Sequence, residues 1–219
     1  MINEGISKEK IFFVGNVMID TLLGHKAKAA KSQILSESNL KKSGYAVLTL
    51  HRPSNVDNKE SLEYIIGILA SIQQKIKIVF PVHPRTLKNI KKYGLLDKIK
   101  NYKSIILTDP LGYLDFICLM SNSKFVITDS GGIQEETTIL NVPCITMRNN
   151  TERPVTVKQG TNMLVSTDKS KIIKACNKII EGAGVKGRIP KFWDGKAAKR
   201  IVESILKTKS GRSSSWEVI

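Results

Sequence analysis

Short apolar runs typical of β-strands alternate with longer stretches of helical periodicity along the chain, and this alternation constrains the fold most. The predicted strands are 11–14, 45–50, 77–82, 104–107, 125–128 and 144–147, with a shorter one at 163–165. The predicted helices are 16–40, 61–74, 84–93, 113–120, 133–140, 170–181 and 195–207. Such alternation predicts a doubly wound, mainly parallel sheet covered by helices on both faces.

Composition excludes several classes of protein. The chain has 219 residues, of which 41% are hydrophobic and 25% charged, a balance typical of a globular protein. No apolar run approaches the ~18 residues that a membrane span needs, and no signal-peptide core precedes the first charges, so we expect a cytoplasmic protein without membrane contact. The three cysteines and three histidines show no ligand spacing, so no metal site is predicted.

The formal net charge of +16 raises the alternative of a nucleic-acid-binding module. Lys supplies most of this charge, because only 7 of the 35 basic residues are Arg. Arg is the residue favoured for bidentate phosphate and base contacts, and the lysines are scattered along the chain. We therefore predict no nucleic-acid partner and interpret the lysines as a solvated surface.

Chemically capable side chains gather where predicted strands end, which is where open parallel sheets bind ligands. The strings at these ends are Gly15-Asn16, His51-Arg-Pro-Ser-Asn55, His83-Pro-Arg-Thr86, Asp109-Pro-Leu-Gly-Tyr113, Asp129-Ser-Gly-Gly132 and Arg148-Asn-Asn-Thr-Glu-Arg-Pro154. Two of the three histidines and four of the seven arginines fall in these strings. This concentration predicts a ligand site along one edge of the sheet.

A strand that runs through Ser130, Gly131 and Gly132 into a helix favours phosphate binding. Glycines let the backbone approach a ligand closely, and the first helical turn offers free N–H groups and the positive end of the helix dipole. Either Glu135 or Glu136 is placed to accept hydrogen bonds from ribose hydroxyls. The alternative is a structural turn in which Ser130 caps the helix.

His51 and His83 each follow a predicted strand and have an Arg within two positions. A histidine beside an arginine can bind or protonate a leaving phosphate, although a lone histidine is more often structural. Arg148 and Arg153 either add positive charge to the same edge or pair with Glu152.

Six strings together resemble the non-hydrolysing UDP-N-acetylglucosamine 2-epimerases. They are Gly15-Asn-Val-Met-Ile-Asp20, His51-Arg-Pro-Ser-Asn-Val-Asp57, Pro81-Val-His-Pro84, Pro110-Leu-Gly-Tyr-Leu-Asp-Phe116, Thr128-Asp-Ser-Gly-Gly-Ile-Gln-Glu-Glu136 and Thr151-Glu-Arg-Pro154. The resemblance covers about residues 11–206. It implies the C-terminal half of a glycosyltransferase-B-like fold, which consists of two Rossmann-like domains around a cleft.

The resemblance implies interconversion of UDP-GlcNAc and UDP-N-acetylmannosamine through elimination and re-addition of UDP, without a cofactor. It assigns the diphosphate to Ser130, Gly131 and Gly132, the ribose hydroxyls to Glu136, and contact with the leaving phosphate to His51, the predicted catalytic residue. The other predicted substrate-binding residues are Arg52, His83, Leu111, Phe116 and Arg153. The resemblance places the uracil at the backbone around Phe116.

Departures from the family pattern define further expectations. Pro53 and Ser54 stand where the family usually has Arg-Glu, within a region that contacts a second, activating UDP-GlcNAc in some members, and Val155 replaces a usual Glu. The resemblance implies that the chain starts at the second domain, with 1–10 as a linker remnant, 11–208 as the UDP-binding domain and 209–219 as a flexible tail. The acid/base carboxylates would then belong to a first domain, supplied by a possible separate chain, and the complete enzyme would be a homo-oligomer, a dimer. The related alternative is the nucleotide-sugar half of a glycosyltransferase.

Overall fold

The computed structural model describes residues 2–209, and residues 210–219 of the predicted tail lie outside it. By internal contacts the chain divides into two compact units, one of residues 26–189 and one whose described parts are 2–25 and 190–209. Within the described residues, no helix is both long and apolar enough to cross a bilayer.

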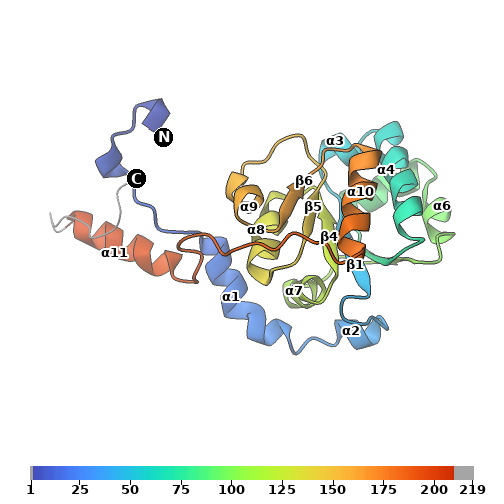
Figure 1. The fold of residues 1–219 in the computed structure, drawn as a ribbon, viewed down its shortest axis with the longest axis horizontal. Helices are drawn as coiled ribbons and strands as arrows, with labels where there is room; N and C mark the ends of the chain where they lie inside the picture. The colour runs from blue at the N-terminus through green and yellow to red at the C-terminus, as the bar shows by residue number, and fades with distance from the viewer. Residues whose placement is uncertain (1, 210–219) are drawn as a thin grey trace. The chain divides into compact units, whose positions relative to one another are not determined.

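The larger unit contains a six-stranded sheet in which every pair of neighbouring strands is parallel (Figure 1). Its strands are β1 (Tyr45–Thr49), β2 (Lys77–Pro81), β3 (Ile105–Thr108), β4 (Phe125–Thr128), β5 (Cys144–Thr146) and β6 (Asn162–Leu164), in the spatial order β3-β2-β1-β4-β5-β6. The predicted doubly wound parallel sheet is therefore confirmed. Since β1 and β4 pair at the centre with Thr49 opposite Thr128, the segments that follow these two strands emerge side by side.

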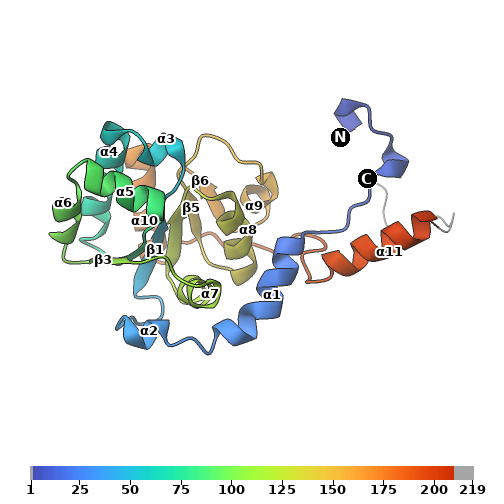
Figure 2. The same cartoon turned by 180° about the vertical axis from the view of Figure 1, so that it is seen from behind.

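Helices cover both faces of the sheet. The strands carry apolar side chains at successive positions, so both faces of the sheet are apolar and each needs a cover. Ala46 and Leu48 contribute to a core with helices α4 (Lys59–Ile72), α5 (Pro84–Lys92), α6 (Leu96–Lys100) and α10 (Lys169–Ile180). Tyr45 and Val47 face a second core with α7 (Tyr113–Ser121) and α8 (Gly131–Leu140). Figures 1 and 2 show α4 and α10 on one side of the sheet and α7 and α8 on the other. The other helices of this unit are α2 (Ile34–Glu37), α3 (Pro53–Val56) and α9 (Pro154–Lys158).

The strand predicted at 11–14 is wrong. Phe12 makes one isolated bridge, and two 3-10 turns, Ile2–Glu4 and Lys8–Lys10, precede it. The apolar side chains of this segment have another partner, since the ring of Phe13 packs against that of Phe192 with centroids 5.4 Å apart. A short apolar run does not distinguish a strand from another buried segment.

The helix predicted over 16–40 is also wrong in extent, because it is divided into α1 (Val17–Ala29) and α2. Ser32 lies at the break, where its hydroxyl accepts from the backbone N–H of Ile34 at 3.2 Å and donates to Asp115 at 2.6 Å. A serine hydroxyl that bonds nearby backbone competes with the helical pattern, which explains the interruption.

The smaller unit is held by contacts of the Gly15–Asp20 motif with the C-terminal segment. A Cβ on Gly15, whose φ is +101°, would lie 2.3 Å from the carbonyl oxygen of Phe192, so only glycine fits there. Asp20 accepts from the backbone N–H groups of Ala197 and Ala198, at 3.1 and 2.7 Å, at the start of α11 (Ala197–Lys209). Gly15 and Asn16 therefore do not follow a strand of the sheet, contrary to the prediction.

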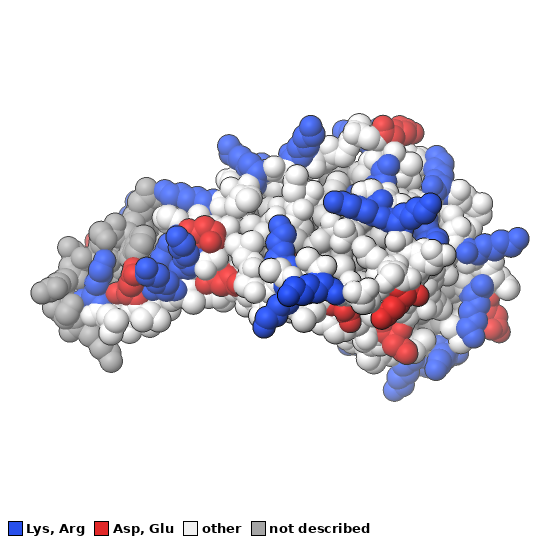
Figure 3. Space-filling view, turned by 90° about the horizontal axis from the view of Figure 1, so that it is seen from below, with Lys and Arg blue, Asp and Glu red and all other residues white. Residues whose placement is uncertain are grey.

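Lys and Arg side chains are spread out on the face drawn in Figure 3, and Asp and Glu side chains lie among them. This distribution agrees with the interpretation of the lysines as a solvated surface.

Candidate functional site at the carboxyl edge of the sheet

The parallel sheet brings five of the predicted site residues around one cavity of 220 Å³. These residues are His51, His83, Leu111, Phe116 and Ser130. They follow β1, β2, β3 and β4 or lie on α7, which is the convergence expected at the carboxyl edge of a doubly wound sheet. The imidazole rings of His51 and His83 are neighbours, with centroids 5.8 Å apart.

The start of α8 is open to a ligand at Gly131 and Gly132. Neither glycine has a positive φ. A Cβ on Gly131 would come no closer than 4.0 Å to Arg148 and Glu152, and one on Gly132 would meet nothing within 4 Å. The fold therefore does not require glycine at either position, and the open space lies where a helix N-terminus presents its free N–H groups.

Ser130 occupies the N-cap position of α8, but its hydroxyl makes no capping hydrogen bond. Its backbone N–H donates to Thr128 Oγ1 at 2.9 Å, which orients the turn. The structural alternative, in which the Ser130 side chain caps the helix, is therefore not what the geometry shows, and Ser130 borders the cavity.

Asp129 lies at the centre of the candidate site, although it was not among the predicted site residues. Its side chain has no exposed surface, and its carboxylate accepts hydrogen bonds from the backbone N–H groups of His51 (3.1 Å) and Arg52 (3.0 Å) and from Asn55 Nδ2 (3.0 Å). It also lies 2.9 Å from His51 Nδ1. Burial raises the pKa of Asp129, but the hydrogen bonds from His51, Arg52 and Asn55 outweigh this effect and hold the pKa below its usual value. Asp129 thus fixes the loop that carries His51.

Glu136 is buried on α8 and is not among the residues that line the 220 Å³ cavity; the hydroxyl of Tyr113 donates to its Oε1 at 3.4 Å. Burial raises the pKa of Glu136 to about 7; the bond from Tyr113 opposes this shift and the neighbouring charge of Glu135 adds to it. Burial and the Glu136 charge likewise raise the pKa of Tyr113 to about 12. Tyr113 was not among the predicted site residues.

The two arginines after β5 pair with carboxylates. Arg153 Nε lies 2.7 Å from Glu135 Oε1, which distinguishes Glu135 from Glu136. Arg148 donates to both oxygens of Glu152, at 2.8 and 2.6 Å, and this contact lowers the pKa of Glu152 to about 2. The sequence left open whether Arg148 and Arg153 add positive charge to this edge or pair with Glu152. In the structure Arg148 pairs with Glu152, whereas Arg153 pairs with Glu135.

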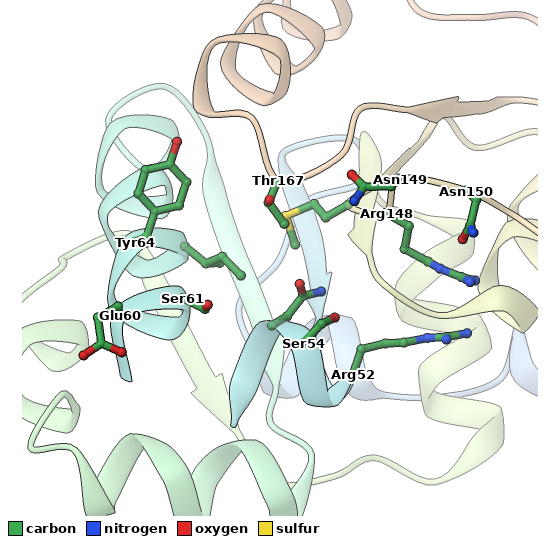
Figure 4. A pocket seen from close by; sticks show the side chains of 12 residues that line it. Arg52, Ser54, Glu60, Ser61, Tyr64, Arg148, Asn149, Asn150 and Thr167 are labelled. Carbon is green, nitrogen blue, oxygen red and sulfur yellow. The ribbon is translucent and has the colours of Figure 1, made fainter. Parts of the chain in front are cut away.

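A second, larger cavity of 660 Å³ lies between α3, the start of α4 and the segment after β5. Arg52, Asn55, Tyr64 and Arg148 are among its lining residues. Figure 4 shows Arg52 and Arg148 extending in the same direction from its two sides. Arg52 therefore lines this larger cavity and does not line the 220 Å³ cavity that His51 borders.

Metal-ligating groups do not gather in this structure: residues 2–209 contain no cluster of three or more His, Cys, Asp or Glu side chains suited to a metal ion. The three cysteines are free and buried. Burial raises the pKa of Cys144 to about 11 and that of Cys176 to about 12, so these thiols are small apolar core groups.

The fold and the site define a Rossmann-like α/β domain that presents a helix N-terminus and two histidines at the carboxyl edge of a parallel sheet. The family model described as UDP-N-acetylglucosamine 2-epimerase matches residues 1–206. The chain belongs to this family.

Several relatives support the same assignment. The chain is 45% identical over 214 residues to a UDP-N-acetylglucosamine 2-epimerase of Methanocaldococcus jannaschii, covering 95% of this chain and 58% of that relative. It is 31% identical to the enzyme of that name from Escherichia coli K12, with coverage of 95% and 58%. The chain thus spans somewhat more than half the length of these curated relatives.

Solved structures agree in fold. The crystal structure of the M. jannaschii UDP-GlcNAc 2-epimerase in complex with UDP-GlcNAc and UDP matches with a TM-score of 0.84 and 43% identity, covering 94% of this chain and 57% of that one. The Neisseria meningitidis UDP-GlcNAc 2-epimerase bound to UDP-GlcNAc matches with a TM-score of 0.78 and 29% identity, covering 94% and 58%. The glycosyltransferase-B-like fold class predicted from the sequence is therefore confirmed.

Proposed function

We propose that this chain is the UDP-binding half of a UDP-GlcNAc 2-epimerase, which interconverts UDP-GlcNAc and UDP-N-acetylmannosamine through elimination and re-addition of UDP. The observation that carries the proposal is the open start of α8 beside a cavity bordered by His51, His83 and Ser130. Family membership and the UDP and UDP-GlcNAc in the M. jannaschii structure support it. They also favour it over the transferase alternative.

Each part of UDP has a counterpart in the proposed site. The N–H groups at Gly131 and Gly132 and the hydroxyl of Ser130 bind the diphosphate, because a helix N-terminus favours anions. The Glu136 carboxylate accepts from the ribose hydroxyls. Leu111 and Phe116 give the uracil ring an apolar wall within the same cavity.

Basic and imidazole groups surround the proposed diphosphate position. His51 contacts the leaving phosphate, and the ring of His83 lies next to that of His51. Arg52 adds positive charge from the neighbouring cavity, whereas Arg153 acts through its ion pair with Glu135, on the helix that holds the phosphate. These groups stabilise a departing UDP, which is the part of an elimination that a binding half can perform.

Epimerisation also needs a base and an acid that move the C2 proton on opposite faces of the sugar. By the family resemblance these carboxylates belong to the first domain. We propose that a further domain, in the same or a separate chain, completes the cleft, and that the complete enzyme is a homo-oligomer. Helix α11 is consistent with such a contact, because Val202, Ile205 and Leu206 are 54–61% exposed at helical spacing.

The experiment that tests the proposed function is a calorimetric titration of the chain with UDP, compared with ADP and with uridine. Saturable binding of UDP that exceeds binding of both other compounds is expected. Equal binding of UDP and ADP would contradict the uracil assignment, and absence of UDP binding would contradict the proposal as a whole.

A further inference from the structure

The hydrogen bonds of His51 determine which of its ring nitrogens carries the proton. Its Nδ1 lies 2.9 Å from Asp129 Oδ1, and the Asp129 pKa is held low. An ionised carboxylate can only accept hydrogen bonds, so Nδ1 must be the donor. Within residues 2–209, Nε2 has no hydrogen-bond partner, and the ring borders the 220 Å³ cavity.

Asp129 cannot easily rotate away from this contact. Its carboxylate simultaneously accepts from the backbone N–H groups of His51 and Arg52 and from Asn55 Nδ2, all within 3.2 Å. The residue is fully buried, and Asn55 is 4% exposed. The ring of His51 is therefore oriented by a carboxylate that the loop itself holds in place.

The neighbouring His83 has the opposite arrangement. It is the N-cap residue of α5, and its Nδ1 accepts from the backbone N–H of Arg85 at 3.2 Å. A nitrogen that accepts carries no proton, so the neutral His83 ring bears its proton on Nε2. His83 borders the same cavity as His51.

We propose that Asp129 is a positioning residue that fixes His51 in the Nδ1–H tautomer. The two neutral rings then present Nε2 to a phosphoryl group in the cavity, without a proton in His51 and with a proton in His83. The neutral His83 ring then donates a hydrogen bond through Nε2. His51 Nε2 is then the ring nitrogen that faces proton exchange with the phosphoryl group, because Nδ1–H is held by the Asp129 carboxylate. This inference rests on the proposed function only for the identity of the ligand, the diphosphate of UDP.

The first test uses the wild-type chain without ligand. Long-range ¹H–¹⁵N spectra at about pH 8.5, about two units above the ordinary histidine range, report the tautomer of each neutral ring. His51 is expected as Nδ1–H and His83 as Nε2–H. His25 is an internal reference for Nδ1–H, because its Nδ1 lies 2.8 Å from the carbonyl oxygen of Thr21. Single substitutions His25→Gln and His83→Gln assign the signals. Finding His51 as Nε2–H would overturn the proposal.

The second test is Asp129→Asn, with Asp109→Asn as the matched control, because Asp109 follows β3 at the same edge and is exposed. The new amide N–H₂ would donate to His51 Nδ1 and move the ring proton to Nε2. The affinity for UDP should fall about tenfold. Without the Asp129 carboxylate, the hydrogen bond from His51 Nε2 to the phosphate changes from a charge-assisted one to a neutral one. Asp109→Asn should change neither the tautomers nor the affinity.

The outcomes separate the inference from the proposed function. An unchanged His51 tautomer in Asp129→Asn, or a changed tautomer with unchanged UDP affinity, would overturn the inference. If Asp129→Asn does not fold, the wild-type spectrum decides alone. Wild-type protein that shows the two tautomers but does not bind UDP would contradict the proposed function and, with it, the assignment of the ligand.

Discussion

Replacing Gly131 or Gly132 with alanine should increase stability and weaken UDP binding at the same time. An added Cβ meets nothing closer than 4.0 Å at either position, and neither backbone is left-handed, so the folded chain accepts alanine without strain. Alanine restricts the unfolded chain and favours the helix, which is worth about 0.4–1 kcal/mol. For a protein of this size, 1 kcal/mol corresponds to a melting temperature increase of about 2–4 °C.

The same methyl groups would occupy the space through which a phosphate reaches the start of α8. Loss of one backbone hydrogen bond to a charged group costs about 1.5–3 kcal/mol, so the UDP affinity should fall by at least about tenfold. Gly131→Val, with a larger side chain, should abolish binding. Calorimetric titration measures the affinity, and thermal unfolding without ligand measures the stability.

Two other glycines supply matched controls. Gly67 lies inside α4 with nothing within 4 Å of an added Cβ, so Gly67→Ala should increase stability and leave UDP binding unchanged. A Cβ on Gly160 would lie 2.3 Å from Thr138 Oγ1, so Gly160→Ala should destabilise the fold. The reasoning is refuted if Gly131→Ala and Gly132→Ala bind UDP as the wild type does, or if they lose stability.

Three further predictions follow from the site. Ser130→Ala should lower the affinity for UDP by about 1–2 kcal/mol without loss of stability, because the hydroxyl makes no capping bond; calorimetry and thermal unfolding test both parts. Since the folded-state pKa of Glu136 is raised to about 7, the group contributes stability below its unfolded-state pKa of 4.5, and this contribution is lost as the pH rises through 7. Relative to Glu136→Gln, urea unfolding should therefore show a loss of about 3 kcal/mol across this window, and an identical pH dependence in the two proteins would contradict the burial argument. Finally, the chain alone should not epimerise UDP-GlcNAc, so proton NMR in D₂O should detect no enzymatic incorporation of deuterium at C2; incorporation would mean that this half contains the groups that move the C2 proton.

The sheet was predictable from the sequence wherever a strand is buried on both faces. Phe125–Thr128 was assigned with its observed bounds, because four apolar or β-branched residues lie between polar neighbours and all four are buried. The segment 11–14 has the same local pattern but packs against Phe192, which lies far along the chain. Local pattern identifies a buried apolar segment and does not identify what covers it.

The site was predictable to the extent that parallel strands align their carboxyl ends. His51, His83 and Ser130 border one cavity because β1, β2 and β4 are neighbours. Asp129 stands in one of the strand-end strings, but its role gave no local signal, since three of its donors belong to His51 and Arg52, 77–78 residues away along the chain. The residues alone did not indicate which of Glu135 and Glu136 accepts from the ribose hydroxyls, and only the family resemblance chose Glu136. In the structure the two differ, because Arg153 pairs with Glu135 and Tyr113 bonds to Glu136.

The most direct test of the central claim is a titration of the chain with UDP in the presence of EDTA, followed by amide NMR. Because a helix N-terminus can hold a diphosphate by itself, binding should not require a divalent ion. The account predicts saturable binding in EDTA, with the largest amide shifts at Ser130–Ile133 and at His51. Binding that appears only with a divalent ion, or amide shifts that lie elsewhere, would contradict it.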